Sequence, residues 1–138
     1  MSYQHKNKLG SYCVTLPDDW EVDVAKTGTS FFDNDGVGII TISTYSKTNT
    51  ARNPCDYVMN FIPSEVVNIA MPVVVYIPSA FSTDPIAFAE YTYKGDAWRV
   101  WCISLKETMI VISYNCDHST KGIEDRTVDA IVSSIRSI

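Results

Sequence analysis

Two adjacent runs in the last third of the chain, residues 98–105 and 109–116, are apolar at both odd and even positions. Successive side chains of a β-strand point to opposite faces of a sheet, so these runs predict strands that are apolar on both faces. Such strands must be covered on both faces. Residues 123–138 follow with apolar side chains at helical spacing, so the stretch predicts a layered core in which helices pack on a sheet.

The size and composition of the chain predict one globular domain. The chain has 138 residues, of which 46% are hydrophobic and 20% charged. This length supports a proper core, and this balance is typical of a folded protein. We therefore expect a single domain over residues 1–138, with residues 1–10 as a flexible segment.

The charge of the chain argues against two classes of partner. The formal net charge is -5, and the basic residues are scattered. Nucleic acids and anionic membranes both need clustered Lys and Arg, so we expect neither as a partner. No stretch approaches the roughly 20 apolar residues of a membrane span. The polar start of the chain has no hydrophobic signal-peptide core, so we expect a cytoplasmic protein if no leader was removed.

The first 45 residues predict an antiparallel meander of four strands. Its strands are expected at residues 12–16, 20–24, 30–33 and 37–45, with apolar and polar residues alternating in the first two. Turn-forming residues separate the strands, among them the sequence Asp-Asn-Asp-Gly at 33–36.

Two helices are expected to cover the sheet. Asn53 is a good N-cap and Pro54 suits the first helical position, so a helix is predicted near 54–70. Pro63 interrupts it, and we expect a kink or two short helices with Ser64 as a second N-cap. Further strands are expected at residues 73–77 and 86–93. The chain should close with a helix near 121–136. The whole is an α+β fold with an antiparallel sheet of about six to seven strands between helices.

Two segments resemble the PsbP/Mog-like domains. The first is residues 12–20, Tyr-Cys-Val-Thr-Leu-Pro-Asp-Asp-Trp, in which an alternating strand runs into Pro, a polar turn and Trp. The second is residues 112–116, followed by a helix that closes on residues 131–136. The whole chain is also similar to a family of small uncharacterised bacterial proteins with this layout. The resemblance implies an α/β/α sandwich. In the wider group, members act as photosystem accessory proteins, as Ran-GTPase binders, or as adhesion- or toxin-related partners, but no binding motif of these maps onto this sequence.

Two local patterns are similar to catalytic or metal-binding motifs but lack features that such sites require. Cys116, Asp117 and His118 put a thiol, a carboxylate and an imidazole together, but Cys116 shares its strand parity with apolar residues and should face the core. Residues 33–36 resemble part of a calcium loop, yet an EF-hand register would put Phe31 and Ile42 at ligand positions.

The four cysteines and two histidines predict neither disulfides nor a metal site. Zinc ligands come in close pairs such as Cys-x-x-Cys, and the cysteines at 13, 55, 102 and 116 form none. Their wide spacing inside apolar patterns is typical of reduced, packed thiols. We expect no metal and no cofactor.

The most suggestive candidate site is an aromatic cluster around the turn at residues 94–96. Its members are Tyr91, Tyr93, Trp98, Arg99 and Trp101. Trp, Tyr and Arg dominate the binding energy of protein interfaces, although they also fill cores. Glu90 is the one acid inside this strand pair, expected at the solvent or as a cleft carboxylate.

Two function classes follow from these observations. The first is a non-enzymatic protein-binding module of the accessory or immunity type, which would bind an unknown protein and be a monomer or weak homodimer. The alternative is a small enzyme or ligand-binding domain that uses a cleft near the 115–122 loop, with Asn115, Asp117 and His118 at its edge. Because no catalytic motif occurs, we favour the binding module.

Overall fold

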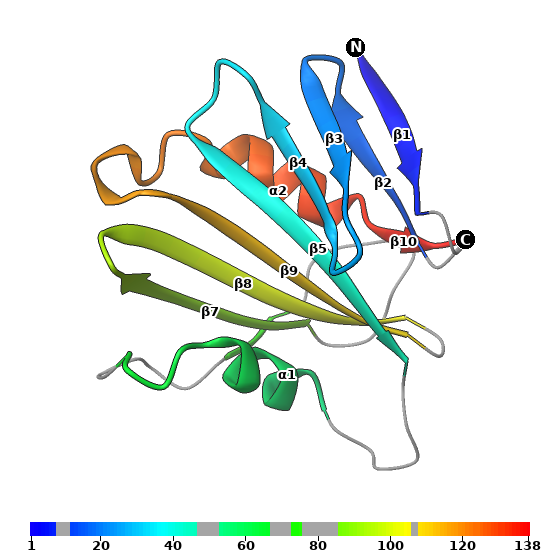
Figure 1. Cartoon of the computed structure of the whole chain (residues 1–138). Coiled ribbons are helices and arrows are strands. Elements are labelled where there is room, and N and C mark those ends of the chain that lie inside the picture. Colours follow the sequence, from blue (N-terminus) through cyan, green and yellow to red (C-terminus); the bar gives the residue numbers. More distant parts are fainter. Residues whose placement is uncertain (8–11, 47–52, 67–72, 76–85, 106–107) are drawn as a thin grey trace.

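A seven-stranded antiparallel sheet forms the centre of the fold in the computed structural model (Figure 1). The structure describes residues 1–7, 12–46, 53–66, 73–75, 86–105 and 108–138. Within these residues the strand order of the large sheet is β3-β4-β5-β9-β8-β7-β6, and a second sheet has the order β1-β2-β10. This arrangement confirms the predicted α+β class with an antiparallel sheet between helices.

The predicted strands are found close to their expected bounds within the described residues, and β1 and β10 occur in addition to them. In chain order they are β1 (Ser2–Lys6), β2 (Tyr12–Pro17), β3 (Trp20–Val24), β4 (Thr29–Asp33), β5 (Gly38–Ser46), α1 (Pro54–Phe61), β6 (Val73–Val75), β7 (Ile86–Tyr93), β8 (Asp96–Leu105), β9 (Thr108–Asp117), the 3-10 turn η1 (His118–Thr120), α2 (Asp125–Ser133) and β10 (Arg136–Ser137). The predicted positions 67–70 of the first helix and 76–77 of the following strand lie outside the described residues.

Strand β9 is central because it pairs along its length with β5 on one side and with β8 on the other. Its even-numbered residues face α2, and its odd-numbered residues face α1. Both sets are apolar over most of the strand, with Ile110 and Ile112 at 0% exposure on one face and Met109 and Val111 almost as buried on the other. The expectation that this strand is covered on both faces is confirmed.

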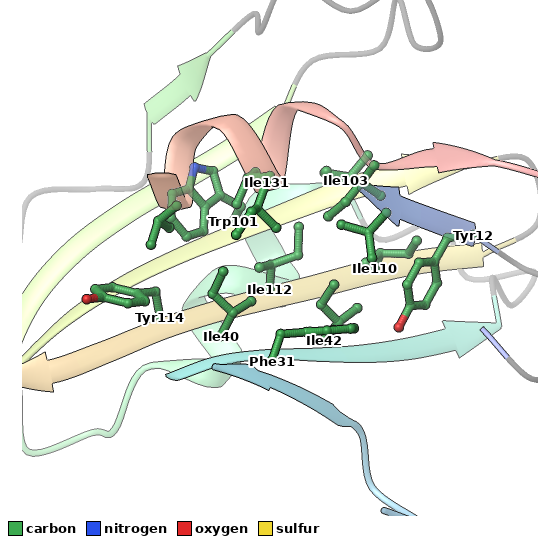
Figure 2. Packing of buried hydrophobic residues seen from close by; sticks show 14 of the residues in the cluster. Tyr12, Phe31, Ile40, Ile42, Trp101, Ile103, Ile110, Ile112, Tyr114 and Ile131 are labelled. Atoms are coloured by element: carbon green, nitrogen blue, oxygen red, sulfur yellow. The ribbon is translucent and has the colours of Figure 1, made fainter. Parts of the chain in front are cut away.

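The two faces of the large sheet carry separate cores. The larger core lies under α2 and the small sheet, where Ile131 packs with residues such as Phe31, Ile112 and Trp101 (Figure 2). The smaller core lies under α1, whose Val58 packs on β7, β8 and β9. In Figure 1 the two helices accordingly lie on opposite sides of the sheet.

The expected four-stranded meander is wrong in its first strand. Strands β3, β4 and β5 do form a meander, but β2 pairs with β1 and β10 rather than with β3. Strand β2 is buried from Tyr12 to Val14, so the backbone N–H and C=O groups on both of its edges need partners. The small sheet supplies these neighbours from the two ends of the chain.

The N-terminal segment is therefore ordered in part, contrary to the expected flexibility of residues 1–10. Ser2–Lys6 pairs with β2 in a five-residue register. The Tyr3 hydroxyl donates a hydrogen bond of 2.7 Å to the carbonyl of Trp20. A polar strand gains its order here from the backbone ladder, which a hydrophobicity pattern does not reveal.

The first helix begins as predicted and ends earlier than predicted. The Asn53 side chain accepts from the backbone N–H of Asp56, the Asp56 carboxylate accepts from that of Asn53, and Pro54 starts the helix. The helix ends at Phe61, because the residue before Pro63 is pushed out of the helical region; Ile62 is extended, with ψ of 129°. Residues 63–66 form a turn and not a second helix.

The closing helix is shorter at both ends than the predicted span 121–136. Gly122 has φ of +92°, which places a turn where the helix was expected to begin. At the other end Arg136 and Ser137 pair with β2, so the chain leaves the helix to complete the small sheet.

The core under α1 should make the protein sensitive to alkali. Burial raises the pKa of the Cys102 thiol to about 12, with a smaller contribution from Cys55. The unfolded chain loses this proton near the ordinary pKa of about 9, whereas the folded protein keeps it. The free energy of unfolding is therefore unaffected below pH 9 and falls as the pH rises toward the pKa of the folded state. We expect the free energy of unfolding to fall by roughly 1 kcal/mol between pH 8.5 and 10.

This fall can be measured by urea denaturation at a series of pH values. Buried tyrosines such as Tyr91 and Tyr114, whose pKa values are also raised, add to the fall as the pH approaches 10. The variant Cys102→Ala should therefore reduce the slope, most clearly between about pH 8.5 and 9.5, because it has no thiol at this position. An unchanged slope in the variant would contradict the assignment to Cys102.

Candidate functional site

The predicted aromatic cluster is divided between the two faces of the sheet. In the β7–β8 hairpin Tyr91 is paired with Trp98, and both side chains lie on the α1 face. Arg99 and Trp101 differ from Trp98 by one and three positions, so their side chains lie on the α2 face. The hairpin turn itself is tight, with positive φ at Lys94 and Gly95.

Trp98 lies at the centre of the aromatic residues on the α1 face. Its ring stacks on Tyr91 at 6.0 Å with an angle of 3° between the planes, and it contacts the Phe61 ring at 6.1 Å. The side chain is half-buried, and within the described residues its indole N–H has no hydrogen-bond partner. Burial raises the pKa of Tyr91 to about 12, so its hydroxyl stays protonated at neutral pH.

Tyr93 connects the same hairpin to the turn that follows α1. Its hydroxyl donates a hydrogen bond of 2.6 Å to the carboxylate of Glu65. This bond lowers the pKa of Glu65. The Lys94 ammonium lies 5.2 Å from the centre of the Tyr93 ring. This hydrogen bond therefore connects Tyr93 of β7 to the turn that follows α1.

Arg99 and Trp101 join the α2 face to its helix. Trp101 is only 3% exposed, and the Arg99 guanidinium lies 4.7 Å from its ring. Arg99 donates a hydrogen bond of 2.6 Å to Asp129 and lies 3.5 Å from both Glu90 and Asp125. Arg99 therefore connects β8 with β7 and with α2, and Glu90 is part of this ion-pair network.

A cavity of about 250 Å³ lies between the sheet and the segment that leads into α2. Its walls include Glu90, Arg99, Tyr114, Lys121 and Asp125. This is the region where the sequence predicted an alternative cleft. The cavity is small and is lined by charges of both signs.

The three residues expected at that cleft have other positions. Asn115 lies on the α1 face, opposite Trp98 in the register of β8 and β9. Asp117 caps the 3-10 turn by accepting from the backbone and hydroxyl of Ser119. His118 is exposed, and its backbone N–H donates to the carbonyl of Gly95. None of the three is among the residues described as lining the cavity.

Cys116 lies in the core, as its parity predicted. It is 4% exposed and packs in the α2-side cluster. The neighbouring Tyr114 donates a hydrogen bond of 2.8 Å to Glu124, whose carboxylate also accepts from the backbone N–H of Val37. Burial, followed by this acidic neighbour, raises the pKa of Tyr114. Glu124 thereby fastens the start of α2 to the sheet and to the β4–β5 turn.

The described helices cover only half of the α1 face of the sheet. Helix α1 packs over β7, β8 and β9, and among the described elements no helix covers β3, β4 and β5 on this side. Ile39 and Tyr45 of β5 are 44% and 47% exposed, and Phe32 of β4 is half-buried on the same face. We call these three side chains, together with Tyr57 and Phe61 of α1, the open face.

The open face includes a groove between α1 and β5. A hollow of about 440 Å³ is lined by Tyr45, Tyr57, Asn60, Phe61 and Val111. The rings of Tyr45 and Tyr57 contact each other at 5.8 Å across it.

The strand register places Ile39 of the open face in one row with the predicted aromatic residues. Along one row of the sheet Tyr91 pairs with Trp98, Trp98 with Asn115, and Asn115 with Ile39. The open face is thus continuous with Tyr91 and Trp98.

The margin of the open face is acidic. Glu21 and Asp23 of β3 are exposed on its outer edge, where Glu21 pairs with Phe32 and Asp23 with Ser30. Asp56 is exposed at the start of α1. The face therefore presents apolar and aromatic surface next to negative charge.

The residues of the open face were missed in the sequence, although a signal for them exists. The adjacent pairs Phe31–Phe32 and Ile39–Ile40 each place one large apolar side chain on either face of the sheet. The pairs indicate apolar surface on both sides, but they do not say which side a helix covers.

The acidic turn at residues 33–36 is a structural turn. The Asp33 side chain accepts a hydrogen bond of 3.0 Å from the backbone N–H of Asp35, and its carbonyl accepts from that of Gly36. In the part of the chain that the structure describes, no three His, Cys, Asp or Glu residues are grouped as metal ligands. Neither described helix is long and apolar enough to cross a membrane.

Comparisons with known proteins show similarity in fold at low sequence identity. A Bacteroides thetaiotaomicron protein of known structure matches 98% of the chain at 12% identity and a TM-score of 0.70, and the match spans 48% of that protein. Cyanobacterial PsbP (CyanoP) from Synechocystis matches 99% of the chain and 92% of its own at 11% identity and 0.69. The Ran-binding protein Mog1p of Saccharomyces cerevisiae matches 99% and 95% at 9% identity and 0.61. Neither a family model nor a curated protein matches the chain.

These matches confirm that the chain has a PsbP/Mog-like fold, as the strand-Pro-turn-Trp segment suggested. The chain spans about half the length of the Bacteroides protein and nearly all of the other two. At identities of 9–12% the likeness concerns the fold alone.

Proposed function

We propose that this domain is a non-enzymatic module that binds a protein partner on the open face. The observation that supports it is a sheet surface that none of the described helices covers, on which Ile39 is exposed and Tyr45 is exposed beside the groove of α1. Large apolar side chains exposed on one face mark interaction sites on monomeric proteins, and here Thr41 and Ser43 of β5 lie between Ile39 and Tyr45. Aromatic side chains such as Trp98 and Phe61 supply large contact area with few rotamers to order.

The charge of the open face indicates the chemistry of the partner. Its apolar floor is bordered by Glu21, Asp23 and Asp56, and the whole chain has a net charge of -5. A complementary partner would present an apolar ridge flanked by Lys or Arg, which would also speed association. Mog1p, described as Ran-binding, offers a precedent for protein binding by this fold, by analogy only.

We further propose, in line with the expectations drawn from the sequence, that residues 1–138 form a single domain. This domain works in the cytoplasm of a bacterium as an accessory or immunity-type protein, and the free protein is a monomer or weak homodimer.

Photo-crosslinking in the native host tests the proposal. A photoreactive amino acid in place of Ile39 should yield one discrete crosslinked protein, whereas the same group in place of Ala130, exposed on α2, should not. A second variant, Tyr45→Glu, should abolish the crosslink at position 39, because a charge in an apolar contact costs about 2 kcal/mol or more.

The matched control is Arg126→Glu on the exposed side of α2, which should leave the crosslink at position 39 intact. Equal labelling at positions 39 and 130 would contradict a specific open face. Recovery of a second copy of this chain as the crosslinked species would show a homodimer interface instead. Unchanged crosslinking in Tyr45→Glu would also overturn the proposal.

The small cavity beside residues 121–125 supports a second candidate function, binding of a small ligand. Its 250 Å³ would accept only a small molecule, and its lining combines Lys121 with Arg99, which is ion-paired to Glu90 and Asp125 in the same wall. This charge pattern suits a small zwitterion. A screen of amino acids by thermal shift, with Lys121→Gln as the variant, would identify such a ligand; no shift with any of them would remove this candidate.

A further inference from the structure

A third cavity lies between the two sheets, away from the open face and from the small cavity near α2. It measures about 560 Å³, within the range of roughly 300–1,000 Å³ typical of small-molecule pockets. One wall comes from the end of β1 and the start of β2, and the other from the β3–β4 turn and from β5. Two sheets that share a core under Tyr12 thus separate at this end of the molecule.

The surface inside this cavity is mainly apolar, although Asn7 and the threonines at 27, 29 and 44 also line it. Ile42 and the ring of Tyr12 are part of its floor, and Val24 at its rim is 60% exposed. The Tyr12 hydroxyl already bonds to Thr29 and Asn7, and burial raises its pKa, so it stays neutral. A ligand inside would therefore meet hydrocarbon, and its polar group would find no open partner at Tyr12.

The rim of the cavity is positively charged. Lys6 and Lys26 belong to opposite walls, and both are exposed. Lys6 pairs with Cys13, on the face of β1 opposite to that of His5, so its ammonium would reach the rim around the end of the strand. His5 lies beside them with its ring 5.3 Å from Phe31, and burial lowers its pKa, so the lysines supply the charge at neutral pH. Among the described lining residues none is acidic, although the chain as a whole has a net charge of -5.

We propose that this cavity binds a medium-chain carboxylate, with its hydrocarbon chain between the sheets and its carboxylate at Lys6 and Lys26. An apolar interior with a cationic rim is complementary to an amphiphile that has one anionic end. Charge complementarity selects the anion, and the satisfied Tyr12 hydroxyl directs the head group to the rim rather than to the floor. The site is separate from the open face, so either proposal can fail without the other.

Titration calorimetry with octanoate, decanoate and dodecanoate, each below its micelle concentration, tests the inference. Burial of each additional methylene should tighten binding about fourfold until the cavity is filled, so decanoate should bind roughly fifteenfold more tightly than octanoate. Dodecyltrimethylammonium, which has the same chain with a cationic head, should bind much more weakly. On dodecanoate binding, amide resonances of Thr27, Gly28 and Thr44 should shift, and that of Gly95 should not.

Two variants separate the contributions of charge and chain. The double variant Lys6→Gln/Lys26→Gln should weaken dodecanoate binding about fivefold or more, because both changes remove exposed positive charge and leave the fold intact. Val24→Asp should weaken it further by placing a negative charge at the rim. The matched control Lys121→Gln, at the other cavity, should change nothing.

Three outcomes would overturn the inference. One is equal binding of dodecanoate and dodecyltrimethylammonium. Another is an affinity that does not depend on chain length, which would indicate an anion contact without a buried chain. The third is binding to anionic phospholipid vesicles with no binding of monomeric dodecanoate.

Discussion

Replacement of Trp101 by alanine should lower the free energy of unfolding by about 3–5 kcal/mol, whereas Trp98→Ala should lower it by only about 1–2 kcal/mol. Trp101 is 3% exposed in the α2-side core, so its removal leaves a cavity and takes away the ring beneath Arg99. Trp98 is half-buried and contacts the rings of Tyr91 and Phe61 at the edge of the α1-side core. The two tryptophans are three residues apart and lie on opposite faces of the sheet. This difference in position explains why their replacement lowers the free energy of unfolding by different amounts.

Chemical denaturation followed by far-UV circular dichroism measures both costs without relying on tryptophan fluorescence. If Trp101→Ala fails to fold, Trp101→Phe should still lose about 1–2 kcal/mol, because it removes less volume. The same variants test the open face: Trp98→Ala should weaken crosslinking at position 39, and Trp101→Phe should not. Equal losses of stability for the two alanine variants would contradict the division of the cluster.

Gly38→Ala should destabilise the protein by about 3 kcal/mol, a large effect for one added methyl group. A Cβ atom at Gly38 would lie 2.6 Å from the ring and hydroxyl of Tyr114 and 2.7 Å from the carbonyl oxygen of Asn115. Neither neighbour can give way easily. The Asn115 oxygen is backbone in the central strand, and the Tyr114 ring is 2% exposed with its hydroxyl bonded to Glu124.

The same substitution in a Tyr114 variant tests whether the Tyr114 ring is the cause of the destabilisation. In a Tyr114→Ala protein the ring is absent, so Gly38→Ala should cost measurably less than in the parent. Thr41→Ala, on the same strand, is the matched control and should cost less than about 1 kcal/mol. Gly95→Ala should cost about 1 kcal/mol for another reason, since its Cβ would meet nothing within 4 Å but its φ is +86°. A cost below 1 kcal/mol for Gly38→Ala would contradict the close approach.

Much of the local structure could be predicted because its causes are local. Alternation and turn residues predicted β3 and β7 at their observed bounds, and Asn53 with Pro54 predicted the start of α1. The apolar character of β8 and β9 on both faces predicted a sheet covered on both sides. Each of these signals depends on a few neighbouring residues and on the two-residue period of a strand.

The candidate site could be predicted only in part, because it depends on which elements lie next to one another. Tyr91 and Trp98 were identified correctly as neighbours, since a tight hairpin pairs them. Trp101 and Arg99 were grouped with them because closeness in sequence does not distinguish the faces of a strand. Ile39 and Tyr45 were missed, because their exposure depends on where α1 lies.

By itself the sequence determined the fold class, most strand positions and the burial of Cys116, because apolar periodicity and turn chemistry act over short distances along the chain. Only the tertiary structure decided that β2 leaves the meander for β1 and β10, and that, among the described elements, α1 covers only half of one sheet face. It alone also brings Lys6 and Lys26 to one cavity. The reason is physical: pairing between distant strands and the placing of helices depend on competition among many apolar surfaces, which no local pattern specifies.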